Sequence, residues 1–344
     1  MTFNKYNNKG LSGLYNLGNT CFINACMQII SHTYELNELF PSHHAISFNK
    51  TPETMLFLEW NKLRQILWSS NCIIRPEKFI KTVHLLAEYK NINIFTGYSQ
   101  NDLPEFLIFI INSFHVSISR KVSIKINGFI KNEKDKIALK CFEMIKEFYS
   151  KEYSEIWNLF YAIHISEIKS SINDEIFSIK PEPYFIINLP IPAKITLPTL
   201  YDCFDLYTEN ELLDGDNKWY NEKTQEKESV YKKNYFWSFP NILIIDLKRF
   251  NSNNMKNQKL VLFDIYNLNL SKYSVGYNNN SYIYELYGIC NHTGNVMNGH
   301  YTSYIKNSNG KWYHFNDDVI SEMLNINAII TPNAYCFFYR KKQL

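Results

Sequence analysis

The stretch GLYNLGNTCFINACMQII, residues 13–30, decides the fold, because a glycine-containing turn leads through a cysteine into an apolar helix. After Cys21, apolar side chains recur at the spacing of one helix face. A lone cysteine in such a helix is more often a small core residue. At a first helical turn, however, the helix N-terminus favours the reactive thiolate. Backbone N–H groups of residues 19–21 and the side-chain amide of Asn16 are expected to face an oxyanion formed near the sulfur. Cys26 lies mid-helix and is predicted to be core.

A thiolate mechanism also needs a base and a group that orients it, and a hairpin near the C-terminus supplies both. Asn309-Gly310 is a strong turn signal, so the chain folds back and brings His300 close to Asn316, within a residue or two of register. A carboxamide beside an imidazole fixes its tautomer and ring plane. Gly299 leaves space for a substrate backbone. A single strand histidine is usually structural, but a Cys, a Gly-His and a paired Asn together favour catalysis.

Two other histidines compete with His300 for the role of base. His292 and His314 are close in sequence, and His314 shares a strand face with Asn316 by the two-residue period. No glycine precedes His314, so it ranks second. Asp317 follows Asn316 directly and is expected to support the site.

Composition narrows the class of protein. The 344 residues carry 36 basic and 33 acidic side chains, which gives a net charge of +3 and no strong case for nucleic acid. Seven scattered cysteines do not suggest a disulfide framework. The first ten residues have no apolar stretch typical of a signal peptide, and the apolar run 106–114 is about half a membrane span. We expect a monomer in the cytoplasm or nucleus, or in the host cytoplasm if viral, that binds no membrane.

The two halves of the chain differ in their periodicity. Helix starts are predicted at Thr51-Pro52-Glu53, at Pro76 and at Asp102, and residues 133–160 are helix-like. The second half is rich in β-branched and aromatic residues. Its polar stretch 209–233 is expected to form a solvated extension or a mobile hairpin. A helical lobe followed by a β-rich lobe predicts an α+β fold with a cleft between the lobes.

Six segments, taken in order, resemble the conserved boxes of the ubiquitin-specific proteases, a family of papain-like deubiquitinating cysteine proteases. The similarity covers residues 13–339. The six segments are GLYNLGNTCFINACMQ, GYSQNDLPEFLIFIINSF, FPNILIIDLKRF, YELYGICNHTG, NGHYTSYIK and WYHFNDDVIS.

The resemblance implies one catalytic domain over residues 1–344. A helical thumb would span about 13–165, and β fingers and a β palm about 166–344. The implied reaction is hydrolysis of the isopeptide or peptide bond after the C-terminal glycine of ubiquitin, through an acyl-enzyme, with ubiquitin and ubiquitinated proteins as partners and no cofactor. The implied roles are nucleophile for Cys21, general base for His300, orienting residue for Asn316, oxyanion donor for Asn16 and supporting carboxylate for Asp317.

The acidic pair Asp102 and Glu105 has a structural and a functional interpretation. Asp-x-x-Glu before an apolar run is typical of a capping box, which explains it structurally. The resemblance implies in addition that this box holds the basic, extended tail of ubiquitin, with Gly299 and Tyr301 also at the substrate. Asn101 and Pro104 depart from the family pattern, so the local geometry is expected to differ.

A second departure concerns the fingertips. Many family members bind a structural zinc there through two CxxC pairs, and zinc needs about four nitrogen or sulfur ligands. The matching positions are Ser170-Ser171-Ile172-Asn173 and Asn221-Glu222-Lys223-Thr224, so we predict no metal. Hairpin pairing and aromatic packing would then hold the fingers, with candidates at Trp219, Tyr220, Tyr235 and Trp237.

Two alternatives remain open at this point. The fold would also serve a module that binds ubiquitin without cleaving it, and an electrophilic ubiquitin probe distinguishes the two because only an activated Cys21 is labelled. The enzyme would alternatively cleave a ubiquitin-like modifier or an ordinary peptide. A metal-dependent hydrolase is disfavoured, because the sequence has no HExxH motif.

Overall fold

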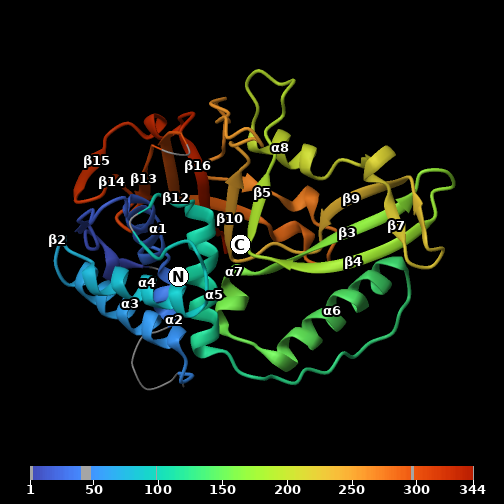
Figure 1. The fold of residues 1–344 in the computed structure, drawn as a ribbon, viewed down its shortest axis with the longest axis horizontal. Coiled ribbons are helices and arrows are strands. Elements are labelled where there is room, and N and C mark those ends of the chain that lie inside the picture. Colours follow the sequence, from blue (N-terminus) through green and yellow to red (C-terminus); the bar gives the residue numbers. More distant parts are fainter. Residues whose placement is uncertain (1–2, 40–47, 98, 296–297, 344) are drawn as a thin grey trace.

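The computed structural model describes residues 3–39, 48–97, 99–295 and 298–343. Helices dominate the first half of the chain (Figure 1). They are α1 (Cys21–Ser31), α2 (Tyr34–Leu39), α3 (Pro52–Ser69), α4 (Glu77–Tyr89), α5 (Leu103–Ile118), α6 (Glu133–Lys151) and α7 (Glu155–Phe160), with α8 (Leu200–Tyr207) later in the chain. None of the helices in these described ranges is both long and apolar enough to span a bilayer.

The second half is built from strands in two larger sheets, which confirms the predicted α+β class. The main sheet has the order β15-β14-β13-β12-β16-β10-β5, with β11 paired to β12, and the finger sheet has the order β4-β3-β9-β6. The main-sheet strands are β5 (Ile186–Leu189), β10 (Ile242–Leu247), β11 (Leu268–Asn269), β12 (Ile283–Gly294), β13 (Gly299–Lys306), β14 (Trp312–Asn316), β15 (Val319–Met323) and β16 (Ala334–Lys341). The finger strands are β3 (Ala162–Ser170), β4 (Ile176–Tyr184), β6 (Glu211–Leu213) and β9 (Val230–Phe236), and beyond them lies the hairpin of β7 (Trp219–Asn221) and β8 (Glu226–Glu228).

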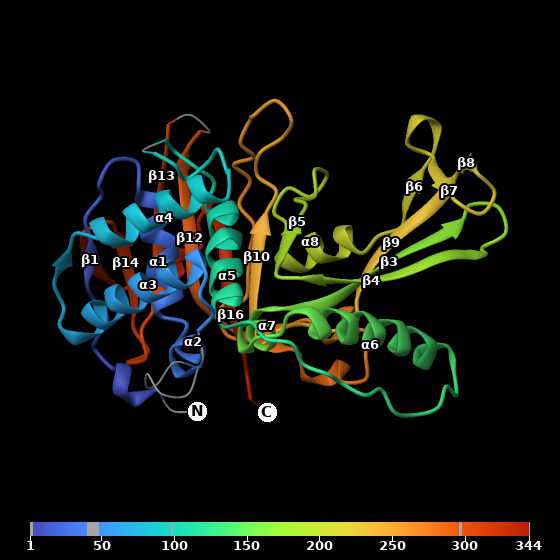
Figure 2. The ribbon, with the colours of Figure 1, turned by 60° about the horizontal axis from the view of Figure 1, so that its bottom comes forward.

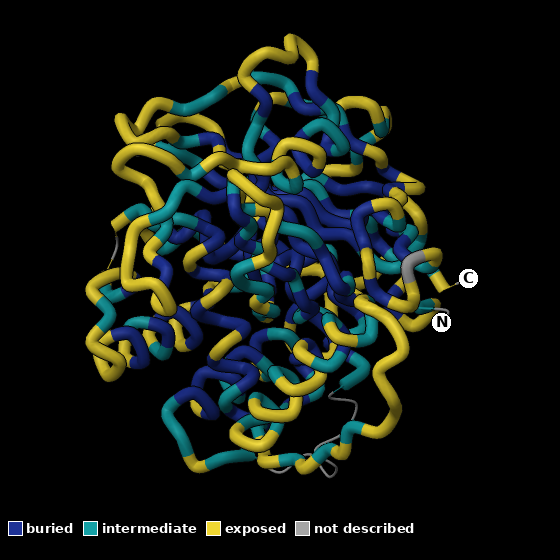
Figure 3. The backbone as a smooth tube through the Cα atoms, turned by 90° about the vertical axis from the view of Figure 1, so that its right-hand side faces the viewer, coloured by how far each residue is buried: buried dark blue, intermediate teal, exposed yellow. Residues whose placement is uncertain are grey.

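Helix α1 lies at the centre of the helical lobe, between α5 and the main sheet. Every one of its residues is buried, so the helix is enclosed on all sides and not only on the apolar face that the sequence suggested. The enclosure is close: a Cβ on Gly288 of β12 would come within 2.9 Å of Ile29. Cys26 is fully buried in this core, as predicted. The buried strands of the sheet lie inside a shell of exposed loops (Figure 3).

A short parallel pair, β1 (Gly13–Leu14) with β2 (Ile73–Ile74), fastens the segment before α1 to the helical lobe. On its other side, the Leu14 N–H donates to the carbonyl of Asp317, at 2.9 Å, in the turn after β14. Gly13 is required here, because a Cβ would lie 2.3 Å from the carbonyl oxygen of Asp318. The segment Gly13–Leu14 therefore lies between the α3–α4 connection and the turn after β14.

The finger sheet extends away from the helical lobe, with α6 packed beneath β4 (Figure 2). The stretch 209–233, expected to be a solvated extension or a mobile hairpin, is largely exposed, and it contains the β7–β8 hairpin together with β6 and most of β9. Among the aromatic candidates, Trp219 stacks on Phe177, with 5.9 Å between ring centroids, and the Tyr235 hydroxyl donates to Glu167. Tyr220 is exposed and does not serve as packing.

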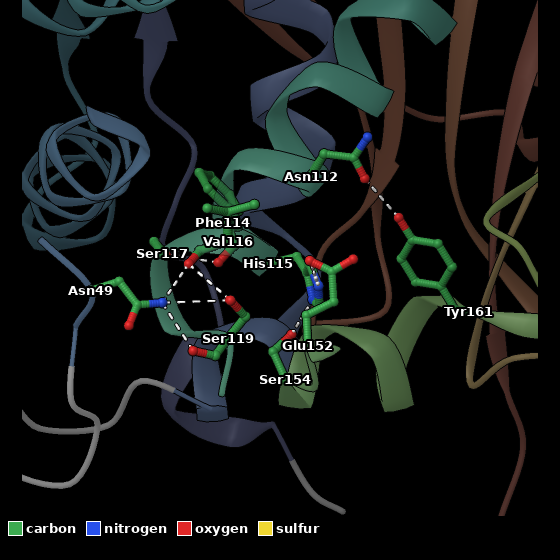
Figure 4. A network of polar contacts seen from close by, with 10 residues as sticks. All are labelled: Asn49, Asn112, Phe114, His115, Val116, Ser117, Ser119, Glu152, Ser154 and Tyr161. Atoms are coloured by element: carbon green, nitrogen blue, oxygen red, sulfur yellow. Dashed lines mark hydrogen bonds and ion pairs between the residues drawn. The ribbon is translucent and has the colours of Figure 1, made fainter. Parts of the chain in front are cut away.

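Polar contacts join the helical lobe to the base of the fingers at the end of α5 (Figure 4). The buried ring of His115 hydrogen-bonds the Ser154 hydroxyl, with 2.7 Å between Nδ1 and Oγ, and Glu152 lies 3.7 Å from Nε2. Nearby, the Tyr161 hydroxyl donates to Asn112 on α5 at 2.8 Å. Residues 152–154 also break the helix predicted over 133–160 into α6 and α7. The other predicted helix starts are confirmed by α3, α4 and α5.

The end of α1 carries a buried histidine. His32 is fully buried, its Nδ1 lies 2.8 Å from the carbonyl oxygen of Gln28, and its ring contacts Trp68 and Phe315. Burial is the main reason why the pKa of His32 falls from 6.5 to about 4. The unfolded chain, in which the pKa of His32 is about 6.5, binds a proton at this side chain more readily than the folded protein does. The contribution of His32 to the free energy of unfolding is therefore full above about pH 6.5 and is lost as the pH falls toward about 4.

We therefore expect His32→Phe to weaken the pH dependence of stability. Between pH 7 and pH 5, wild type should lose about 2 kcal/mol more unfolding free energy than the variant. Urea unfolding at the two pH values measures this difference. Trp68→Phe alters the same cluster without removing a titrating group, so it should keep the wild-type pH dependence. Equal pH dependence in wild type and His32→Phe would contradict the assignment.

Candidate active site

The predicted nucleophile Cys21 is the first residue of α1, and the loop before it turns sharply. Gly18 and Asn19 have φ values of 108° and 52°, in the region that glycine and asparagine adopt most readily. The Cys21 side chain is 3% exposed, so the sulfur lies inside the junction between α1 and the main sheet. Cys21 begins the helix, so its N–H is among the first N–H groups, which have no partner within the helix.

His300 and Asn316 come together on neighbouring strands of the main sheet. Ser303 pairs with Phe315 and Tyr304 with His314, so His300 is a diagonal neighbour of Asn316 on one sheet face rather than its direct partner. His300 Nε2 lies 2.7 Å from Asn316 Oδ1, which leaves Nδ1 as the ring nitrogen for Cys21. The hydrogen bond to Cys21 is the largest cause that raises the pKa of His300 to about 9, and Asn316 adds to it against the effect of burial.

The carboxylate of Asp317 connects the segments that form the site. One oxygen accepts from Asn24 Nδ2 on α1 at 2.8 Å, and the other accepts from Asn16 Nδ2 at 2.9 Å. Asp317 itself has φ 51°, which turns the chain after β14 so that the carboxylate faces α1. Its backbone carbonyl accepts from Leu14. A single residue after the predicted orienting group therefore ties the cysteine helix to the histidine sheet.

The side chain of Asn16 is held in one orientation. Its Oδ1 accepts from the N–H groups of Gly18 and Thr20, at 3.0 and 3.1 Å, and from the Thr20 hydroxyl. Its Nδ2 donates one hydrogen to Asp317 and retains a second. The Thr20 N–H already donates to Asn16 Oδ1. The expectation that the N–H groups of residues 19–21 all face an oxyanion is therefore wrong for Thr20.

A glutamine side chain fixes the backbone just before the histidine. Gln100 donates to the carbonyl of Gly299 and accepts from its N–H, each at 2.7 Å. A Cβ on Gly299 would lie 2.2 Å from Nε2 of His292, so the protein's own histidine already fills the space next to this glycine. That packing explains the glycine structurally, and approach of a substrate at Gly299 stays a prediction. His292 is thus a packing residue, and its pKa falls to about 4, mainly through burial.

The acidic box does not cap α5 in the expected way. Asp102 is the N-cap residue, but its side chain makes no capping hydrogen bond. Its Oδ1 accepts instead from the hydroxyls of Tyr301 and Tyr335, at 3.1 and 3.0 Å. Glu105 is exposed on the first turn. The predicted capping box is therefore wrong, because the Asp102 carboxylate binds the hydroxyls of Tyr301 and Tyr335 and not the N–H groups of α5.

The second candidate base, His314, does not approach the cysteine helix in this way. It pairs with Tyr304 in the β13–β14 ladder, and the two rings are 5.0 Å apart. The pKa of His314 is lowered by burial and then by the charge of His300. Of the two strand histidines, His300 is the one that shares a hydrogen bond with Cys21.

At the fingertips, the positions that the resemblance matches to CxxC pairs make hydrogen bonds within the protein. Ser171 donates to the carbonyl of Ser229 at 2.8 Å, and Asn221 and Thr224 both donate to Glu228 Oε1. Within the described residues, no group of three or more His, Cys, Asp or Glu side chains is arranged to hold a metal ion.

Sequence reasoning missed two residues that position the site and one that lines the cavity beside it: Asn24, Gln100 and Asp246. Asn24 and Asp246 each interrupt an apolar run, which is a usable signal, since buried polar residues need a partner. Gln100 lies in a polar stretch and gives no such signal. The partners were not predictable, because Asn24 and Asp317 are 293 positions apart in the sequence. As a whole, the site combines a thiol at a helix start, an imidazole, its orienting amide and a second amide that retains a free donor. This set suits nucleophilic acyl transfer.

Comparisons with known proteins agree with this chemistry. The ubiquitin carboxyl-terminal hydrolase family pattern matches residues 12–339. The chain is 32% identical to ubiquitin carboxyl-terminal hydrolase 2 of Bos taurus over 98% of its length and 56% of the relative's. It is 25% identical to a probable ubiquitin carboxyl-terminal hydrolase of Acanthamoeba polyphaga mimivirus, over 98% and 92% of the two chains.

A solved structure has the same fold. The SAGA Ubp8/Sgf11/Sus1/Sgf73 DUB module bound to ubiquitin aldehyde superposes with a TM-score of 0.72 and 25% identity, covering 98% of this chain and 71% of that one. The chain spans about half the length of its first curated relatives, at 56% and 55%. The match over nearly the whole chain and the arrangement of Cys21 and His300 lead to one conclusion: the chain belongs to the ubiquitin carboxyl-terminal hydrolase family.

Proposed function

We propose that the protein is a deubiquitinating cysteine protease that hydrolyses the bond after the C-terminal glycine of ubiquitin. The observation that carries this proposal is the hydrogen bond between His300 and Asn316, in a site where the neighbouring Cys21 raises the pKa of His300, within the fold of a family named for this activity. Solved relatives bound to ubiquitin add support for ubiquitin as the substrate.

In the proposed reaction, the Cys21 thiol gives its proton to His300, and the resulting thiolate attacks the carbonyl carbon of the terminal glycine. Negative charge then develops on the carbonyl oxygen. The remaining hydrogen of Asn16 Nδ2 and the N–H of Cys21 are the donors that would stabilise it. His300 gives its proton to the leaving lysine amine, and later takes one from the water that releases the acyl-enzyme. Asn316 keeps the ring plane aligned throughout.

The first prediction tests the nucleophile. Cys21→Ala should abolish cleavage of a ubiquitin–fluorophore conjugate and labelling by an electrophilic ubiquitin probe, because both need the sulfur. Cys26→Ala is the matched control: its thiol is fully buried in the core, so the variant should still be labelled. Cleavage by Cys21→Ala at the wild-type rate would rule the assignment out.

The second prediction concerns pH. The pKa of His300 is raised to about 9, so its proton is present below that pH and lost above it. We expect kcat/KM to decline above about pH 9 as the proton donor disappears. Asn316→Ala removes one cause of the raised pKa, so the alkaline decline should begin at lower pH, with a smaller loss of activity than in His300→Ala. A decline at the same pH in wild type and Asn316→Ala would contradict this role.

The third prediction concerns Asp317. Asp317→Ala should lower kcat by up to about 100-fold, because Asn16 and α1 lose the anchor that aligns them with His300. Binding of ubiquitin to the variant, measured by titration, should stay close to wild type. Asp318→Ala removes the adjacent carboxylate and should retain activity. Equal effects of the two substitutions on kcat would show that the carboxylate of Asp317 does not align the site.

A further inference from the structure

An extended arm, residues 119–132, connects α5 to α6 and contains no helix or longer strand of its own. It runs outward from the end of α5, and α6 returns along it toward the base of the fingers (Figures 1 and 2). The candidate catalytic residues belong to other elements, the start of α1 and the strands β13 and β14. No step of the proposed reaction uses this arm.

One edge of the arm's backbone is paired, and the other edge is open. Arg120 forms an antiparallel bridge with Tyr153, in which the N–H of each residue lies 2.8 or 2.7 Å from the carbonyl oxygen of the other. The Val122 N–H then donates to the carbonyl of Tyr149 at 2.8 Å. In an extended chain, successive residues direct their N–H and carbonyl groups to opposite edges. The groups of residues 121, 123, 125 and 127 therefore face away from the paired side.

The open edge has no partner in the part of the chain that the structure describes. The Lys131 N–H donates to the Asp135 side chain and so ties the far end of the arm to α6. Between the two tied ends, no backbone group of residues 123–130 makes a hydrogen bond with a described residue. This open stretch is longer than a typical strand of about 5–6 residues. A row of free N–H and carbonyl groups on an extended segment is a template for the addition of another strand.

The side chains of the arm alternate as they do in a strand with one covered face. The apolar side chains of Val122, Ile124 and Ile126 are half-buried, and the residues between them are exposed. Farther along, Phe129 is 90% exposed and Ile130 is 53% exposed. Two adjacent large apolar side chains in water are stabilised by a partner that covers them.

The arm carries only positive charge. Residues 119–132 contain one arginine and three lysines, and no aspartate or glutamate. The guanidinium of Arg120 is already paired with Glu155. The side chains of Lys121 and Lys125, by contrast, form no ion pair or hydrogen bond with a described residue. Opposite charges on facing strands stabilise the pair, and like charges destabilise it, so the open edge favours an acidic neighbour.

We infer that the arm is a docking strand for an extended, acidic segment of a partner protein, which adds to the open edge through backbone hydrogen bonds. Carboxylates of the segment face Lys121 and Lys125, and an apolar side chain covers Phe129 and Ile130. A second copy of the chain fits this edge badly, because pairing two arms would bring their lysines together. The inference goes beyond the proposed function, because it adds a partner-binding surface that the reaction does not need.

The test uses a fluorescent peptide of alternating glutamate and valine, as long as the arm, and follows its binding to the full chain by fluorescence anisotropy. Wild type should bind the peptide, and Lys121→Glu/Lys125→Glu should lose at least about tenfold in affinity through like-charge repulsion. Lys78→Glu/Lys81→Glu on α4 is the matched control, because it changes the net charge equally at two exposed lysines. This control should bind as wild type does.

Two results of this comparison would overturn the inference. One is the absence of peptide binding by wild type. The other is an equal loss of affinity in the two double variants, which would show a general effect of net charge and not a site on the arm. All of these measurements concern binding alone, so a loss of cleavage would affect the proposed function and not this inference.

A second peptide distinguishes strand addition from simple electrostatic attraction. It has the same sequence with methylated backbone nitrogens, so it keeps every charge but cannot donate hydrogen bonds to the arm. Its affinity for wild type should be lower than that of the unmodified peptide by about tenfold or more. Equal affinity of the two peptides would contradict docking by strand addition.

Two further measurements address other occupants of the open edge. In sedimentation, wild type and Lys121→Glu/Lys125→Glu should behave alike. Self-association that the double variant abolishes would assign the edge to a second copy and refute the acidic partner. Vesicles that contain phosphatidylserine should not bind wild type more than the double variant. Vesicle binding that depends on the two lysines, without binding of the peptide, would assign the arm to a membrane surface instead.

Discussion

The hydrogen bonds that the Asp317 carboxylate accepts are the interaction that holds the parts of the candidate site together. The carboxylate accepts from Asn24 on α1 and from Asn16 in the preceding loop, and it follows directly after Asn316 on β14. Because it is partly buried and charged, its hydrogen bonds to two amides are stronger than neutral ones and fix both donors. The loop before α1 and α1 itself are therefore both joined to the turn that follows β14. Gly13 allows the loop before α1 to pack against the turn after β14, because only a residue without a side chain fits beside the carbonyl of Asp318.

Much of the fold was predictable from local patterns. Helix starts at Pro52 and Glu77 follow from capping and proline rules, and the β-rich second half follows from composition. The turn at Asn309-Gly310 was enough to bring His300 near Asn316, although the observed pairing is diagonal. These successes share one cause: each feature depends on residues that are close in sequence.

The features that sequence reasoning missed or misjudged depend on distant partners. Asp102 was expected to cap α5, but Tyr301 and Tyr335 take its carboxylate from across the main sheet. The polar stretch 209–233 was expected to be a solvated extension or a hairpin and is largely exposed, but its pairing through β9 with β3 could not be read from its polar residues. In the same way, the isolated Asp246 in β10 gave no sign of the cavity that surrounds it.

The contacts of Asp317 with Asn16 and Asn24 have a consequence for biosynthesis. Cys21 is synthesised well before β13, β14 and the Asp317 turn, which come much later in the sequence. Closing so long a loop is slow, and the helical lobe has to persist meanwhile without the sheet that encloses α1. An incomplete chain thus exposes the apolar surface of α1 but has no imidazole beside its thiol. The order of synthesis therefore leaves Cys21 without its histidine neighbour until β13 has been made.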